Sequence, residues 1–124
     1  MIERYIRHPW GVVLGLSIFF IFSIAAVIPV EYIPLDTRYD KIQHASIFLL
    51  LTCSIAASLR INHWIIGFVL SIFAVASECI QNVIPYRSGS WEDLYADFIG
   101  IVLACLLLEI FTRIYRVLRK AWSC

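Results

Sequence analysis

Residues 78–100, ECIQNVIPYRSGSWEDLYADFIG, decide the fold of this chain. An apolar run leads into Glu78, Pro85 interrupts it, and a second apolar run follows. Proline cannot continue a helix, and Ser90 followed three residues later by Asp93 has the pattern of a helix-capping box. The stretch therefore predicts the end of one helix, a turn and the start of another.

Composition places these helices in a membrane. Of the 124 residues, 61% are hydrophobic and 15% are charged, and the mean hydropathy is +0.84, whereas soluble domains are about a quarter charged. Apolar stretches suited to crossing about 30 Å of hydrocarbon cover residues 10–30, 42–59, 64–84 and 94–112. We predict one domain, an all-α integral membrane bundle of four transmembrane helices, with a basic tail at residues 113–124.

The distribution of Lys and Arg predicts the orientation, because these residues concentrate in cytoplasmic flanks. Three lie on one side of the predicted bundle, and seven lie on the other: Arg4, Arg7, Arg60, Arg113, Arg116, Arg119 and Lys120. We therefore expect both termini in the cytoplasm and the tail as an amphipathic helix on the anionic leaflet. The net charge of +1 gives no reason to expect nucleic-acid binding.

Ionisable side chains occur at the outer ends of three predicted spans. A carboxylate that faces hydrocarbon is strongly unfavourable, so such residues usually point into the bundle and mark a site. Small residues on the same helical stripes, such as Ala74 and Gly100, would let neighbouring helices approach closely. We predict a ligand-binding or catalytic cluster near the outer face, formed by Asp40, Lys41, His44, Glu78, Gln81, Arg87, Asp93 and Asp97.

Some of these residues also have a structural interpretation at a helix start. Asp93 can be the acid of the capping box. Asp40 can interact favourably with a helix dipole, and Lys41 can be a cation that reaches the interface. These interpretations leave open whether the three side chains also contact a ligand.

The deeper residues have different structural alternatives. Arg87 can neutralise Glu78 or Asp97, and Gln81 can link two helices by a hydrogen bond. Glu78 and Asp97 lie too deep to act as caps, so we expect either a site or a buried ion pair for them.

Four motifs occur in a specific order between about Asp40 and Ala104. They are Asp40-Lys41-x-x-His44, Glu78-x-x-Gln81, Pro85-x-Arg87 and Asp93-x-x-x-Asp97-x-x-Gly100. This order resembles the VanZ-like family of small bacterial membrane proteins, named after a protein linked to lowered susceptibility to the glycopeptide teicoplanin. The resemblance implies a multi-pass protein of the bacterial plasma (inner) membrane. The family usually has Asn at the position of Asp97, which puts a role for a neutral amide donor in doubt.

Several functions are compatible with this cluster. One is an envelope protein that binds an amphipathic, lipid-linked or glycopeptide ligand without turnover. Another is an intramembrane hydrolase or transferase for a lipid-linked substrate, with Glu78 or Asp97 as base, His44 as acid–base partner, and Arg87 with Lys41 as an anion clamp. No catalytic motif is visible, so the binding function is slightly favoured and enzymatic activity stays open.

Two further expectations concern assembly and cofactors. A proton-coupled transporter subunit would need to oligomerise, and we expect membrane lipids as partners while leaving homo-oligomerisation open. His44, Glu78, Asp93 and Asp97 carry nitrogen and oxygen ligands for a metal. Because no closely spaced ligand motif is present, we predict no metal and no cofactor.

Overall fold

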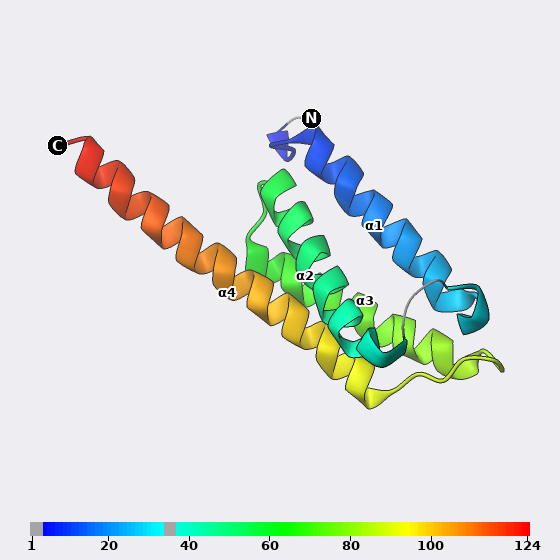
Figure 1. Ribbon diagram of the computed structural model, residues 1–124. Coiled ribbons are helices and arrows are strands. Elements are labelled where there is room, and N and C mark those ends of the chain that lie inside the picture. The colour runs from blue at the N-terminus through cyan, green and yellow to red at the C-terminus, as the bar shows by residue number, and fades with distance from the viewer. Residues whose placement is uncertain (1–3, 34–36) are drawn as a thin grey trace.

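The computed structural model describes residues 4–33 and 37–124, and within them the chain forms four long helices (Figure 1). These are α1 (Pro9–Val27), α2 (Asp40–Ser58), α3 (His63–Val83) and α4 (Trp91–Trp122). Two short 3-10 turns, η2 (Val30–Tyr32) and η3 (Thr37–Tyr39), precede α2. Each long helix is long and apolar enough to cross a membrane. The predicted all-α bundle with four spans is confirmed. Residues 34–36, in the connection between the first two predicted spans, lie outside the described residues.

Local capping signals explain where two of the helices begin. The Asn62 side chain accepts a hydrogen bond from the backbone N–H of Trp64 (2.9 Å) at the start of α3. The hydroxyl of Ser90 accepts one from the backbone N–H of Asp93 (3.0 Å) at the start of α4. These bonds satisfy backbone donors that would otherwise lack a partner in the first turn.

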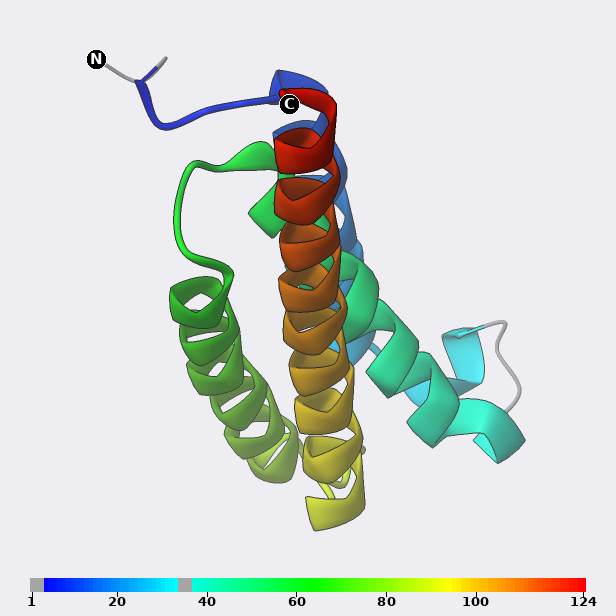
Figure 2. The same cartoon turned by 90° about the vertical axis from the view of Figure 1, so that its left-hand side faces the viewer.

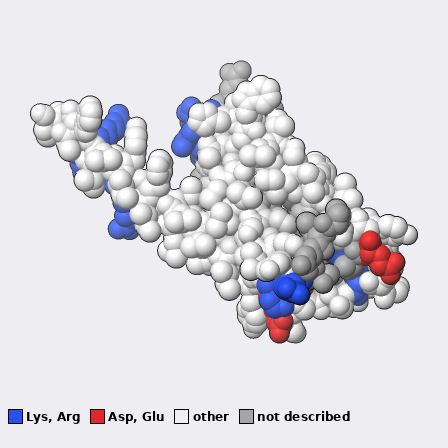
Figure 3. All heavy atoms as spheres, viewed as in Figure 1, with Lys and Arg blue, Asp and Glu red and all other residues white. Residues whose placement is uncertain are grey.

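The basic tail differs from the prediction. α4 continues past residue 112 to Trp122 without a break, so the tail extends the fourth span and is not a separate surface helix. With 32 residues and a rise of about 1.5 Å per residue, α4 is about 48 Å long, longer than the roughly 30 Å of hydrocarbon in a bilayer. Its C-terminal part projects beyond the other helices (Figure 1) and carries Lys and Arg side chains (Figure 3).

α2 is the central helix of the bundle. It packs along α4 on one side and along α1 on the other, while α3 packs mainly on α4 (Figure 2). A glycine permits a close approach of α4 to α2, because a Cβ on Gly100 of α4 would overlap the backbone carbonyl oxygen of Ala45 in α2. The start of α1 and the end of α4 lie at the same end of the bundle (Figures 1 and 2).

Aromatic side chains pack in the apolar core next to the polar end of the bundle. Phe22 of α1, Phe48 of α2 and Phe73 of α3 pack together with ring centroids 5.3–6.0 Å apart. The ring of His44 lies edge-on to Phe22 at 5.8 Å. Many large apolar side chains point outward from the bundle, as a lipid-facing surface requires. His44 therefore stands where the apolar core meets the polar end.

Candidate functional site

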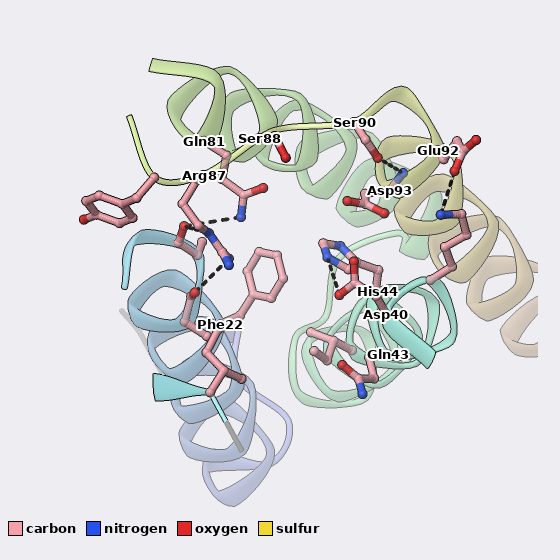
Figure 4. Close-up of a pocket in the computed structure, with 16 residues that line it drawn as sticks. Phe22, Asp40, Gln43, His44, Gln81, Arg87, Ser88, Ser90, Glu92 and Asp93 are labelled. Carbon is pink, nitrogen blue, oxygen red and sulfur yellow. Dashed lines mark hydrogen bonds and ion pairs between the residues drawn. The ribbon is translucent and has the colours of Figure 1, made fainter. Parts of the chain in front are cut away.

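A cavity of about 400 Å³ opens where α2 and α4 begin and where α3 passes into α4 (Figure 4). This end of the bundle is opposite the start of α1 and the end of α4 (Figure 1). Six of the eight predicted site residues line the cavity: Asp40, Lys41, His44, Gln81, Arg87 and Asp93. The other two, Glu78 and Asp97, are buried within reach of His44. The structure thus brings all eight predicted residues to one end of the bundle.

His44 connects the cavity to the buried carboxylates. Its Nδ1 lies 2.8 Å from Oδ1 of Asp97, whose side chain is fully buried. Its Nε2 lies 3.8 Å from Oδ1 of Asp40, at the cavity wall. A carboxylate bonded to one ring nitrogen fixes the orientation of an imidazole and leaves the other nitrogen for chemistry or binding.

Glu78 has a structural role that the sequence did not predict. Its Oε2 accepts a hydrogen bond from the backbone N–H of Ser90 (3.0 Å), at the start of α4. In a capping box that N–H would bond to the acid three residues later. Two predictions were therefore wrong: Asp93 is not the reciprocal capping acid, and Glu78 is not too deep to cap, because it reaches α4 from α3. The Asp93 carboxylate instead faces His44 (Figure 4).

Arg87 is bonded to the end of α1 and to neither buried carboxylate. Its Nε donates to the carbonyl oxygen of Ala26 (3.1 Å), and its Nη2 donates to that of Ala25 (3.0 Å). The predicted ion pair with Glu78 or Asp97 is wrong, because the guanidinium meets the partial negative charge at the helix C-terminus. These contacts use two of the five N–H donors of the guanidinium, and Arg87 still lines the cavity, so the anion clamp stays a prediction.

Two neighbouring side chains complete this cap of α1. Gln81 donates to the carbonyl oxygen of Ala26 (3.3 Å), which matches the prediction that it links two helices. The Tyr86 hydroxyl, which the sequence reasoning missed, donates to the carbonyl oxygen of Val27 (2.7 Å). α1 has no basic residue in its last turn. Since the last carbonyls of a helix need donors, this lack was a sequence signal that the donors come from elsewhere in the chain.

Lys41 also forms an ion pair within the chain. Its Nζ lies 2.6 Å from Oε2 of Glu92, with both side chains largely exposed. This ion pair joins the starts of α2 and α4 at the cavity rim, and such exposed pairs contribute little to stability. Sequence reasoning missed Glu92, because a contact between two helix starts leaves no spacing pattern in the chain.

These contacts make the cavity rich in hydrogen-bond acceptors. The cations Lys41 and Arg87 are engaged at Glu92 and at the α1 carbonyls, while the carboxylates of Asp40 and Asp93 lie beside His44. Such a wall suits a ligand that brings hydroxyl or amine donors more than one that brings an anion.

Comparison with protein-family models, curated proteins and solved structures found no match to this chain. The resemblance to the VanZ-like family rests on the motifs alone and stays a prediction.

Proposed function

We propose that this chain is an envelope protein of the bacterial plasma membrane that binds the headgroup of an amphipathic or lipid-linked ligand at its outer face. The observation that carries the proposal is the acceptor-rich cavity of about 400 Å³, which residues of all four long helices line at one end of the bundle. Its volume falls in the range of about 300–1,000 Å³ that is usual for small-ligand sites. The excess of Lys and Arg at the opposite end supports an outward-facing cavity.

The lining of the cavity supports an amphipathic ligand. Phe22, Ile33 and Ile47 line it together with the acidic residues Asp40 and Asp93. Apolar groups of a ligand would contact the first three residues, while its hydroxyl or amine groups would donate hydrogen bonds to the carboxylates. A phosphate is disfavoured there by like-charge repulsion.

The motif resemblance supports the same proposal. A VanZ-like protein would be expected to lower susceptibility to teicoplanin, and glycopeptides present hydroxyl and amine donors. We therefore favour a binding function, with a headgroup of this kind as the ligand.

A second candidate function is hydrolysis or group transfer on a lipid-linked substrate. The contact between His44 and Asp97 favours it, because a buried carboxylate that orients an imidazole is a common arrangement for a general base. Turnover of a bound probe would distinguish this function from binding alone.

Binding by the purified protein in lipid nanodiscs tests the proposal, with teicoplanin and a polyprenyl-linked disaccharide peptide as probes. A hydrogen bond to a charged group contributes about 1.5–3 kcal/mol. The Asp40→Asn/Asp93→Asn double variant is therefore expected to weaken probe binding about tenfold or more. Thermophoresis gives the affinity, and mass spectrometry of the probe reports any turnover.

Glu109→Gln is the matched control for these substitutions. Glu109 contacts His63 and Arg113, and none of the three lines the cavity. The Glu109→Gln variant should bind the probe with the same affinity as the wild-type protein. An unchanged affinity of the Asp40→Asn/Asp93→Asn variant, or no binding of either probe, would contradict the proposal.

A further inference from the structure

We infer that His44, Glu78 and Asp97 bind one divalent metal ion behind the wall of the cavity. They come from α2, α3 and α4 respectively, and one ligand atom from each lies within 4.8 Å of the others. The sequence predicted no metal, because the three ligands are far apart along the chain. This inference stands on the buried groups and does not depend on the ligand proposed for the cavity.

Two unpartnered oxygens point to the ion. Glu78 is 5% exposed and Asp97 is 0% exposed, so both carboxylates are withdrawn from solvent. One oxygen of each has a hydrogen-bond donor, from the backbone of Ser90 and from His44. The other oxygens, Oε1 of Glu78 and Oδ2 of Asp97, are buried without a hydrogen-bond partner in the described part of the chain. Buried carboxylates are normally paired or bound to a metal, and one ion would satisfy both oxygens.

The local charge favours a dication. The two overlapping groups of potential ligands around His44 contain four carboxylates: Asp40, Glu78, Asp93 and Asp97. One imidazolium supplies a single positive charge at most. The nearby cations are held elsewhere, Lys41 by Glu92 and Arg87 by the carbonyls of α1. A divalent ion would offset the charge of the two buried carboxylates directly.

The spacing of the ligand atoms fits a metal ion after a small adjustment. Nitrogen and oxygen ligands of Zn²⁺ lie about 2.0–2.2 Å from the metal, so two ligand atoms in a tetrahedral site are about 3.4 Å apart. Nδ1 of His44 and Oδ1 of Asp97 are 2.8 Å apart. An ion bound to Nδ1 and to both oxygens of the Asp97 carboxylate would replace the proton that Nδ1 and Oδ1 share. One imidazole with two carboxylates suits Zn²⁺ or Mn²⁺ better than a soft ion such as Cu(I).

Metal titration of the purified protein tests the site, with Zn²⁺ and Mn²⁺ as the probes. We expect one ion per chain by elemental mass spectrometry, and a higher unfolding temperature when the metal is added. Glu78→Gln and Asp97→Asn should each weaken metal binding about tenfold or more. Both replacements preserve shape, and each keeps a carbonyl oxygen that can accept the existing hydrogen bond, from Ser90 or from His44.

Asp40→Asn is the discriminating control, because Asp40 belongs to the neighbouring group with His44 and Asp93. This variant should bind metal more tightly than Glu78→Gln or Asp97→Asn does, because Asp40 contributes its charge to the site and no ligand atom to the ion. Equal loss of metal in Asp40→Asn and Glu78→Gln would move the ion to the neighbouring group and overturn the assignment. The absence of saturable, one-to-one binding of either metal to the wild type would overturn it as well.

Discussion

A Gly100→Val variant is expected to unfold far more readily than the wild-type protein. A Cβ at this position would overlap the carbonyl oxygen of Ala45, and a backbone atom cannot move aside as a flexible side chain can. Overpacking of this kind typically destabilises by about 1–3 kcal/mol, and we expect about 3 kcal/mol. α4 would have to move away from α2, which would lengthen the contact between His44 and Asp97. Unfolding in mixed detergent micelles, followed by circular dichroism, measures the effect.

Ile99→Val is the matched control, because it places the same side chain one position away on α4. Ile99 is 62% exposed on the outer surface of the bundle. Its substitution should change the stability by less than about 0.5 kcal/mol. Wild-type stability of Gly100→Val would show that α2 and α4 do not approach as closely as described.

Arg87→Leu is expected to have the next largest effect on stability. The substitution removes both hydrogen bonds from the guanidinium to the carbonyl oxygens of Ala25 and Ala26. Each such bond with a charged donor contributes about 1.5–3 kcal/mol when buried. Because Arg87 is only partly buried, we expect a total loss of about 2–3 kcal/mol. The end of α1 would separate from the connection between α3 and α4, and the cavity would lose one wall. The same detergent unfolding experiment measures this loss.

Two further variants distinguish a cap of α1 by Arg87 from an ion pair between Arg87 and Glu78. Arg113→Leu removes an exposed partner of Glu109 on the same helix, so its stability should change little. Glu78→Gln and Arg87→Leu should have additive effects in the double variant, since the two side chains share no contact. If Glu78→Gln instead restored the stability lost in Arg87→Leu, the two residues would form an ion pair and the assigned cap would be wrong.

The fold could be predicted from sequence because its signals are local. The length of each apolar run, Pro85, and the caps at Asn62 and Ser90 act within a few residues. The end of α4 was the exception, because hydropathy indicates where lipid contact ends and not where a helix ends. The residues after Thr112 are mainly good helix formers, and the helix continues through them to Trp122.

The candidate site could be predicted only as a set of residues. Carboxylates in apolar runs are unfavourable in lipid wherever they occur, so Glu78 and Asp97 stood out without knowledge of their neighbours. Their partners depend on how the helices are offset against one another. The contact of Glu78 with the start of α4, and that of Arg87 with the end of α1, follow from this tertiary arrangement and have no pattern in the sequence.

Chemical labelling of Ser88→Cys in intact cells tests most directly the central claim, a ligand cavity at the outer face. Ser88 is exposed and lines the cavity, and all four native cysteines are free, so they can be replaced without loss of a disulfide. A membrane-impermeant maleimide should label Ser88→Cys in intact cells, and bound teicoplanin should slow that labelling. A chain that retains only Cys124 should react after permeabilisation alone. Labelling of Ser88→Cys only after permeabilisation would place the cavity in the cytoplasm and contradict the account.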